Sequence, residues 1–310
     1  MNYYLYKIRF TTDVHFGGSD SAQGIRSSED HFRADTLFSA ICQTFIQKGS
    51  NLEDLLDMVR KHEFLLTDSM PYKGEELFIP KPIMRFETDR EIPAEKRKTI
   101  KNIRWIPVTS DITEYEENEL FGSPSVRTQA AISNRDISLP YDVGVYSFAP
   151  DCGLYFIAAL KDEAKESWLS ALISSIGLSG IGGRISSGLG KFEIDDTIYL
   201  NEPFDDQTEI LLDGLEDTAS TKQMMLTSAL PNDEELQTVM ETASFQVVRR
   251  GGFVQSDSFN KVPLKKKTQY YLSAGSIVRN RFDGDLFQVG EHGSHPVYRY
   301  SVPVFMGVKA

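Results

Sequence analysis

Hydrophobic and polar residues alternate near the start of the chain, and this pattern predicts a β-strand over residues 4–10. A helix is expected to begin at Asp35, because Leu37, Ile41 and Phe45 then recur at helical spacing and aspartate is a favourable N-cap. The same criteria predict four further elements in the order helix, strand, helix and strand. They lie at residues 52–60, 146–160 with a break near Pro150, 161–176 and 191–200.

A similar but weaker pattern recurs after residue 220. A helix is expected to start within residues 231–235, because Pro and acidic residues favour the first helical turn. Strands are expected at residues 223–230, 244–249, 269–272 and 296–306. No convincing second helix follows in this half, so we interpret it as a degenerate copy of the first.

The order strand, helix, strands, helix and strand suits a ferredoxin-like (RRM-like) βαββαβ unit, in which helices cover one sheet face. We therefore predict an α+β protein with one ferredoxin-like domain over residues 1–200 and a degenerate second one over 221–310. The acidic stretch at 201–220 is interpreted as a linker. Residues 73–145 exceed what the first core needs, and we interpret them as an insertion of protruding β-hairpins.

The formal net charge of −12 argues by itself against a nucleic-acid-binding protein, because such proteins usually carry a basic footprint. The charges are segregated, however. Residues 192–221 contain no Lys or Arg, whereas 81–104 and 261–267 are rich in them. Such a bipolar surface can hold RNA on one side and a protein partner on the other, although ordinary solvated faces would give the same pattern.

No apolar run approaches the length of a membrane span, and the N-terminus lacks the features of a signal peptide. The protein is therefore expected in the cytoplasm. Cys42 and Cys152 match no metal or redox spacing, so both are expected to be small buried residues. No cofactor and no metal is expected.

A glycine-rich loop at residues 177–191 is the strongest local signal for chemistry. Its glycines permit positive φ and let a ligand approach the backbone amides. Ser186 and Ser187 add hydroxyl donors, and Arg184 and Lys191 add positive charge. This combination suits phosphate oxygens.

Known nucleotide motifs fit this loop poorly. A Walker loop needs GK[ST], but Leu189 follows Gly188, and a Rossmann loop lies between a strand and the next helix, whereas here the order is helix, loop, strand. A nucleic-acid backbone is therefore the better candidate ligand. A tight turn that closes a sheet is the purely structural alternative.

Three segments together resemble the RAMP superfamily of CRISPR proteins: HFGG at residues 15–18, FRADTLFSA at 32–40 and GRISSGLGKF at 183–192. The ending HPVYRY at 295–300 narrows the resemblance to the fourth Csm subunit of type III-A CRISPR effector complexes. This resemblance implies two ferredoxin-like domains that face each other across a cleft.

The resemblance also implies a function and partners. Such a subunit is non-catalytic, caps one end of the complex and holds the repeat-derived 5′ handle of the CRISPR RNA (crRNA). It contacts the large polymerase-like signature subunit and the backbone RAMP subunit. A protruding thumb hairpin contacts or kinks the guide, and residues 126–135 are the candidate thumb here.

Phosphate contacts and splayed bases are what a single-stranded handle requires. Phe16, Phe32 and Phe253 are candidates for stacking on bases, with a core role as the alternative for each. The candidate RNA-binding residues are His15, Phe16, Arg33, Arg127, Arg135, Gly182, Gly183, Arg184, Ser186, Ser187, Gly188, Lys191, Arg249 and Arg250.

Two other functions are open. The chain could be a metal-independent endoribonuclease that processes precursor crRNA, with His15 or, second, His31 as general base, although either histidine could equally be structural or an RNA contact. It could also be a protein-binding scaffold that does not hold the handle. By resemblance the target-cleaving aspartate belongs to the backbone subunit, and capping accounts for Asp35, so no catalytic residue is assigned.

Overall fold

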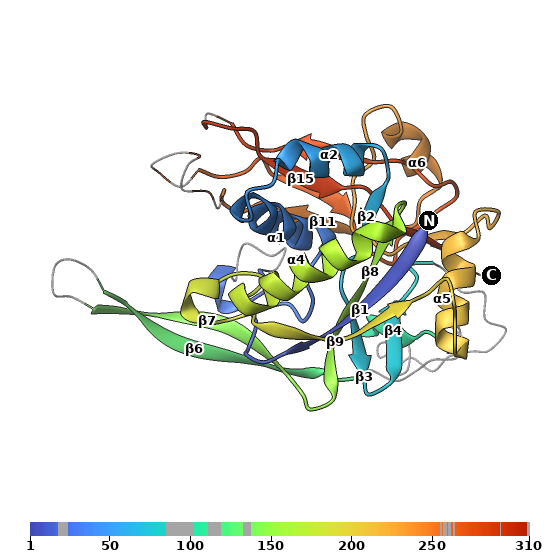
Figure 1. Ribbon diagram of the computed structural model, residues 1–310. Coiled ribbons are helices and arrows are strands. Elements are labelled where there is room, and N and C mark those ends of the chain that lie inside the picture. The colour runs from blue at the N-terminus through green and yellow to red at the C-terminus, as the bar shows by residue number, and fades with distance from the viewer. Residues whose placement is uncertain are drawn as a thin grey trace.

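The computed structural model describes residues 1–17, 24–84, 102–110, 119–132, 138–254, 256, 259, 262, 264–291 and 293–308 of the chain. In this part the protein is a mixed α/β structure built on antiparallel sheets (Figure 1). A helix long and apolar enough to cross a membrane is absent from these residues.

The largest sheet is centred on two long neighbouring strands, β1 (Asn2–Phe10) and β8 (Cys152–Leu160). The strand order is β5-β4-β3-β8-β1-β9, and β2 pairs with β8 as well. The other bounds are Phe64–Leu66 for β2, Met70–Lys73 for β3, Glu76–Pro80 for β4, Trp105–Pro107 for β5 and Phe192–Tyr199 for β9. The strands predicted at 4–10 and 191–200 are thus confirmed.

Every residue of β8 is buried, because the sheet is covered on both faces. Alternate side chains serve two different cores. Leu154 and Phe156 pack in a core with the helices of the first half, whereas Tyr155 and Ile157 pack in a core that includes the C-terminal half. Burial on both faces explains why β8 is a continuous apolar run in the sequence.

Three helices lie over the first face of this sheet (Figure 1). They are α1 (Ala34–Gln47), α2 (Leu52–Arg60) and α4 (Glu166–Ser179). The helix predicted at 52–60 is confirmed as α2. The helix predicted at 161–176 is divided into a 3-10 turn at Glu163–Lys165 and α4.

The prediction that Asp35 caps α1 is wrong. Arg33 is the N-cap residue, its side chain makes no capping bond, and Asp35 lies in the first turn. A distant carboxylate takes over the capping role, because the Ala34 amide donates to Oδ1 of Asp68 at 2.9 Å. The Asp35 side chain is thereby left for another contact, described below.

The long insertion contains β4, β5 and a hairpin of two long strands, β6 (Gly122–Ile132) and β7 (Ser138–Phe148). In Figure 1 this hairpin runs out to the left, away from the body of the molecule. A protruding hairpin was expected there, and it carries the described part of the candidate thumb. Arg135 lies outside the described residues.

The predicted linker at 201–220 contains a helix, α5 (Asp206–Glu216), which packs on the last strand. A Cβ added at Gly214 would lie 2.5 Å from Met306 Cγ, so a glycine allows this close packing. Leu211 and Leu215 enter the second core. The stretch is therefore an ordered part of the fold.

Small antiparallel sheets make up the rest of the second half. One sheet has the order β13-β10-β16 and consists of β13 (Ile277–Val278), β10 (Gln223–Met225) and β16 (Phe305–Gly307). A second pairs β11 (Val247–Arg250) with β12 (Gln269–Leu272). A third pairs β14 (Asp285–Gln288) with β15 (Tyr298–Ser301). The predicted strand at 296–306 is divided into β15 and β16 by a segment with Pro303, which has no amide to donate. The helix predicted from 231 begins later, as α6 (Leu236–Thr242).

Buried hydrogen bonds tie the two halves together. Thr227 Oγ1 donates to the Leu66 carbonyl at 2.7 Å, and Ser228 Oγ donates to Asp68 at 2.5 Å. The Leu66 amide in turn donates to the Tyr300 hydroxyl at 2.9 Å. Because these bonds lie beside a shared apolar core, the halves form one packed body.

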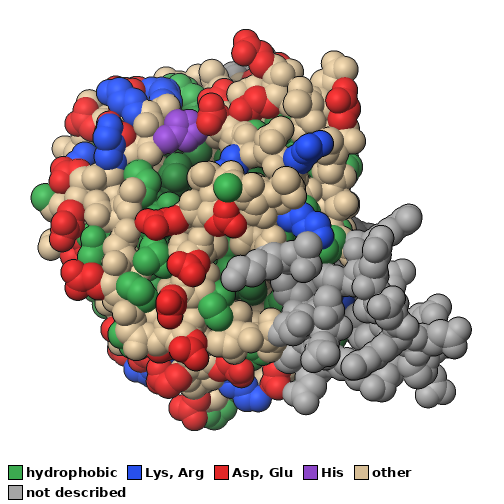
Figure 2. All heavy atoms as spheres, turned by 90° about the vertical axis from the view of Figure 1, so that its right-hand side faces the viewer, with side chains coloured by type: hydrophobic (Ala, Val, Ile, Leu, Met, Phe, Trp, Pro, Cys, Tyr) green, Lys and Arg blue, Asp and Glu red, His purple; other side chains and the backbone are tan. Residues whose placement is uncertain are grey.

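The distribution of charged side chains on the surface agrees in part with the segregation of charges along the sequence. Figure 2 shows that the face on the right of Figure 1, where α5 and both termini lie, carries many more Asp and Glu than Lys and Arg side chains. The acidic stretch 192–221 contributes α5 to this face. Cys152 is buried as expected, whereas Cys42 is half-buried, and both are free thiols.

Candidate nucleic-acid interface

The glycine-rich loop connects α4 to β9 and bends back onto the segment that follows β1. Gly182 has φ +97°, and a Cβ there would lie 2.8 Å from the His15 carbonyl oxygen and 2.8 Å from a ring carbon of Phe16. The Gly183 amide donates to the same His15 carbonyl at 2.8 Å. Glycine is therefore required at 182 for the conformation and for this close approach.

His15 and Phe16 contact the glycine-rich loop on its buried side and support it. Nδ1 of His15 lies 2.7 Å from the Gly144 carbonyl of β7. Phe16 is only 4% exposed and packs edge-on against Phe10 and Phe32. Of the two roles considered for Phe16 and Phe32, the structure favours the core role, because core side chains pack against both rings.

The outer side of the loop faces solvent. Ser186, Ser187 and Lys191 are exposed, and the guanidinium of Arg184 lies 5.2 Å from the ring centre of Tyr141 on β7. A guanidinium over an aromatic face is held by a cation–π interaction while its remaining N–H groups stay available. The predicted loop cations are thus present on the surface.

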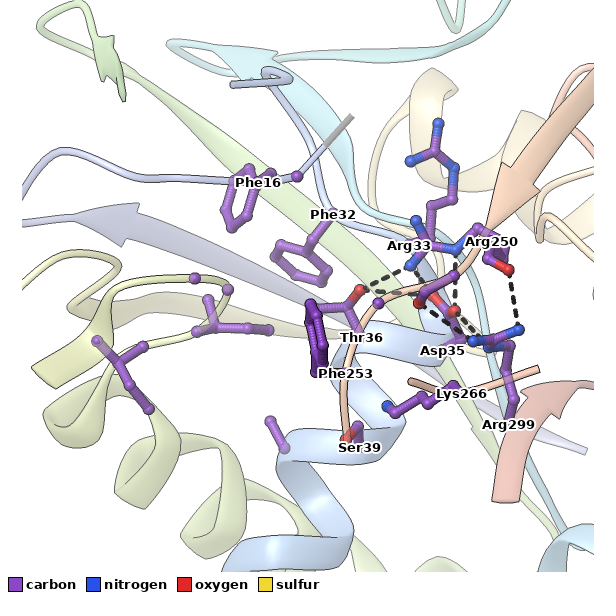
Figure 3. Close-up of a pocket in the computed structure, with 18 of the residues that line it drawn as sticks. Phe16, Phe32, Arg33, Asp35, Thr36, Ser39, Arg250, Phe253, Lys266 and Arg299 are labelled. Atoms are coloured by element: carbon purple, nitrogen blue, oxygen red, sulfur yellow. Dashed lines mark hydrogen bonds and ion pairs between the residues drawn. The ribbon is translucent and has the colours of Figure 1, made fainter. Parts of the chain in front are cut away.

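A pocket of about 420 Å³ opens on the inner side of the loop, and we call it the glycine-loop pocket (Figure 3). Residues 180–183 form one wall, the start of α1 forms the floor, and residues 249–253 with Lys266 and Arg299 form the opposite wall. Segments from both halves of the chain therefore meet around it. Figure 3 shows Phe16 and Phe32 on one side, and Arg250 and Arg299 around Asp35 on the other.

A buried ion-pair cluster, which we call the latch, forms the floor of this pocket. Arg250 binds Asp35 in a bidentate manner, with Nε–Oδ2 at 2.9 Å and Nη2–Oδ1 at 2.6 Å. Arg299 lies 3.7 Å from the same carboxylate and donates to the Arg250 carbonyl at 3.1 Å. Burial alone would raise the pKa of Asp35, but the charge and hydrogen bonds of Arg250 outweigh it and the pKa is lowered.

Two further cations and an aromatic ring line the rim of the pocket outside the latch. Arg249 is exposed, and Lys266 lines the pocket with a pKa that burial lowers despite the opposing charge of Asp35. Phe253 is 52% exposed, and Lys265 Nζ lies 5.9 Å from its ring centre. Cations beside an exposed aromatic ring are the groups that bind the phosphates and bases of a single strand.

Comparisons with known proteins identify the family. The chain is 31% identical to the CRISPR system Cms protein Csm4 of Mycobacterium tuberculosis over 99% of this chain and 98% of that protein. The Streptococcus thermophilus protein of the same name is 30% identical over 98% of each chain. The chain belongs to the Csm4 family.

Its C-terminal part also matches a model of that family, the CRISPR Csm4 C-terminal domain, over residues 218–308. Solved structures share the fold. A chain of a Csm3-Csm4 subcomplex from the type III-A CRISPR-Cas interference complex superposes with a TM-score of 0.64 at 18% identity, covering 100% of both chains. A chain of a Csm1-Csm4 cassette in complex with cA4 gives 0.59 at 17% identity, covering 100% of this chain and 98% of that one.

The matched Csm4 C-terminal domain contributes a whole wall of the glycine-loop pocket, including Arg249, Arg250, Phe253, Lys266 and Arg299. Sequence reasoning named the two adjacent arginines but missed Lys266 and Arg299. The basic run at 261–267 was the signal for Lys266. Arg299 lies in the HPVYRY segment that carried the resemblance, but its pairing with Asp35 depends on a distant part of the chain and has no local signal.

The predicted RNA-binding residues fall into groups in the structure. Those that line the glycine-loop pocket are Phe16, Arg33, Gly182, Gly183, Arg249 and Arg250. Those that do not line it are His15, Arg127, Arg184, Ser186, Ser187, Gly188 and Lys191. Among the latter, Arg127 on β6 forms an ion pair with Asp13, so its charge is already compensated.

The histidines weighed as general bases are both buried. Nδ1 of His31 lies 2.9 Å from Oδ1 of Asp30, which accepts its hydrogen bond, and the ring packs edge-on against Trp105. No group of three or more potential metal-ligating side chains occurs in the described part of the chain. The pocket offers cations, backbone amides and an aromatic ring, which are groups that can bind a single nucleic-acid strand.

Proposed function

We propose that this chain is a non-catalytic subunit of a type III-A CRISPR interference complex and that its glycine-loop pocket holds the 5′ handle of the crRNA. The single observation that carries the proposal is the pocket itself, where the glycine loop of the first half meets Arg249, Phe253 and Lys266 of the second. Glycine-rich backbone, cations and an exposed ring are what a single-stranded backbone with splayed bases requires.

The burial of His15 supports the non-catalytic role. Its ring is packed under the loop and held by the Gly144 carbonyl, so it serves the architecture of the site. A general base must reach the proton that it removes, and a covered ring is badly placed for that. The first candidate base for precursor processing is therefore badly placed for that reaction.

The same proposal includes two protein partners. Solved structures pair other Csm4 chains with Csm3 and with Csm1. By this likeness we propose that the chain contacts a backbone RAMP subunit and a large signature subunit. The acidic face around α5 suits protein contacts better than RNA contacts, because it repels phosphates.

We also propose that the first half is a ferredoxin-like unit and that the second is a degenerate copy, with the division at 201–220. Support comes from the order β9-β1-β8-β2, in which the two central strands are antiparallel, and from helices α1 and α4 on one face. The hairpin β6-β7 is then the proposed thumb.

The test uses the complex reconstituted with its partner subunits and a labelled crRNA. Reversing the two rim cations, with Arg249→Glu and Lys266→Glu together, is expected to weaken handle retention by at least roughly a hundredfold, since each of the two lost charged contacts costs about 1.5–3 kcal/mol. The matched control is Arg60→Glu with Lys61→Glu on the exposed side of α2, away from the pocket. Equal retention by the test and control complexes would overturn the proposal.

A further inference from the structure

The cations that line the glycine-loop pocket differ in how far their charge is compensated. Arg250 and Arg299 both lie against the Asp35 carboxylate in the latch. The ammonium of Lys266, by contrast, forms no ion pair or hydrogen bond with another residue in the described part of the chain, although it lines the same pocket. Burial lowers the pKa of Lys266, although Asp35 acts in the opposite direction, and the two arginines lower it further. A half-buried ammonium of this kind is stabilised by a ligand atom that accepts its hydrogen bonds.

Ser39 on α1 supplies a second polar group to the pocket. One face of α1 borders the pocket, with residues at helical spacing: Thr36, Ser39, Ala40 and Gln43. Ser39 is half-buried, and its hydroxyl makes no hydrogen bond with any other residue that the structure describes. A serine inside a helix often donates to the carbonyl four residues earlier, as Ser175 does to Ala171 at 2.8 Å. Because Ser39 lacks such a bond, its hydroxyl can both donate to a ligand and accept from it.

Flat apolar surface borders these two groups. Ala40 is the neighbour of Ser39 on α1, and the ring of Phe253 on the opposite wall is 52% exposed. Figure 3 shows the Lys266 side chain extending toward α1, where Ser39 lies. An exposed aromatic ring is a stacking platform for a base, and a pocket of about 420 Å³ is large enough for one nucleotide. A base stacked on Phe253 would present its edge to Lys266 and Ser39.

The chemistry of the two groups narrows the choice of base. Lysine only donates hydrogen bonds, whereas a serine hydroxyl donates or accepts. Guanine and uracil carry a keto oxygen next to a ring N–H, so Lys266 can donate to the oxygen while Ser39 accepts from the N–H. Adenine and cytosine carry an amino group in place of the keto oxygen, and an ammonium has nothing that could accept from it. Arg249, exposed at the rim, is then the cation for a phosphate of the same strand.

We propose that Lys266 and Ser39 select a keto base, guanine or uracil, at one position of the bound RNA strand. The inference rests on the proposed function, because it assigns a base specificity to the pocket that holds the strand. Lys266 and Ser39 are then specificity-determining residues, and Phe253 holds the base by stacking. A contact of this kind discriminates against the wrong base by about 1–3 kcal/mol, which corresponds to roughly tenfold or more in affinity.

The test uses the complex reconstituted with its partner subunits and a panel of labelled crRNAs, in which each handle position carries each of the four bases in turn. We expect one position at which guanine or uracil is retained roughly tenfold better than adenine or cytosine. Lys266→Met should remove this preference, and Ser39→Ala should reduce it. The melting temperature of Ser39→Ala should not fall, because the hydroxyl makes no hydrogen bond within the described structure and alanine favours a helix.

The adjacent residue provides a matched control. Lys267 is exposed, forms an ion pair with Glu291 and does not line the pocket, so Lys267→Met removes the same charge without changing the base preference. A base analogue tests the contact directly. Replacing guanine at the selected position by 2-aminopurine, which lacks the keto oxygen and the N1–H, should weaken retention roughly tenfold in the parent and hardly at all in Lys266→Met, because the variant has already lost the partner of that oxygen.

The outcomes separate this inference from the proposed function. If Arg249→Glu with Lys266→Glu weakens retention but the parent tolerates all four bases at every position, Lys266 binds a phosphate, the base selection is wrong and the function stands. If that charge reversal leaves retention unchanged while guanosine and uridine monophosphates bind the full chain more tightly than the adenosine and cytidine ones, and Lys266→Met removes the difference, the function fails and the base site stands. A preference that persists in Lys266→Met overturns the assignment of Lys266.

Discussion

The two walls of the glycine-loop pocket are built in opposite ways. The first wall consists of backbone. Its glycines lie directly against the His15 carbonyl and the Phe16 ring, so the shape of this wall depends on the packing of those two residues. The second wall consists of side chains: Arg249 on β11 and Phe253 shortly after it belong to a segment that the latch holds in place through Arg250. In both walls, however, the surface that faces a ligand rests on buried residues, which are His15 and Phe16 in the first and Arg250 in the second.

Of the changes predicted here, disruption of the latch should lower the stability of the fold most. Asp35→Asn removes the charge that compensates both buried arginines, and loss of one partner of a buried pair typically costs about 3–5 kcal/mol. We expect a loss of this size in the free energy of unfolding, measured by urea denaturation.

Asp57→Asn is the control for the latch. Its partner Arg60 is exposed on α2, so the expected loss is about 0–1 kcal/mol. Similar losses in the two variants would mean that the latch does not hold the second wall.

Phe16 and Phe253 allow a side chain that supports the pocket to be distinguished from one that contacts RNA. Phe16→Ala should lower the free energy of unfolding by about 3–5 kcal/mol, because a buried ring leaves a cavity. Phe253→Ala should leave stability nearly unchanged and weaken handle binding by about 1–3 kcal/mol, the usual contribution of base stacking. Urea denaturation and RNA titration of both variants check this, and a stable Phe16→Ala with weak RNA binding would reverse the assignment.

The phenylalanines also show that local sequence does not predict which aromatic rings are buried. Phe16, Phe32 and Phe253 all lie in segments with glycine or arginine neighbours, and nothing local tells a core ring from an exposed one. By contrast, α2 was predicted to the residue, because its apolar spacing and its N-cap Asn51 are local features. The latch joins residues 215 positions apart, so no spacing rule can reveal it.

The candidate site was predictable to a similar extent. The glycine loop was found because glycine density is a local signal, and the Arg249-Arg250 pair because two basic residues precede two glycines. The structure then separates this pair, with Arg249 at the rim and Arg250 in the latch. The alternation of a short strand decides which neighbour faces out, and its register is set by pairing with β12.

Two glycines of the glycine-rich loop, outside the pocket wall, differ in what a methyl group would meet. Gly190 has φ +78°, and a Cβ there would overlap the Ile181 carbonyl, whereas Gly188 has φ +84° and open space around it. Gly190→Ala should therefore cost about 2–3 kcal/mol, and Gly188→Ala only about 1–2 kcal/mol, the cost of the left-handed conformation alone. Thermal unfolding of the two variants gives the comparison, and equal costs would show that the loop shifts to accommodate the methyl group.

Acid should weaken the latch. The pKa of Asp35 is lowered in the folded state, so its contribution to stability is present above the unfolded value near 3.9 and is lost as pH falls through the folded pKa. We expect the free energy of unfolding to decline below about pH 4. The decline should be shallower in Asp35→Asn, and identical pH profiles would exclude Asp35 as a contributor.

The smallest expected effect compares two surface arginines. Arg249 lines the pocket rim, and Arg249→Ala should lower the dependence of log K on log salt by about 0.7, as expected for one single-strand phosphate contact. Arg127 is half-exposed on the hairpin but is paired with Asp13, which also accepts a hydrogen bond from Ser147 at 2.8 Å. Because that charge is already compensated, Arg127→Ala should leave the salt slope unchanged and alter stability by about 0–1 kcal/mol. A slope that falls equally in both variants would mean that the pair with Asp13 opens on binding and that the hairpin donates a phosphate contact of its own.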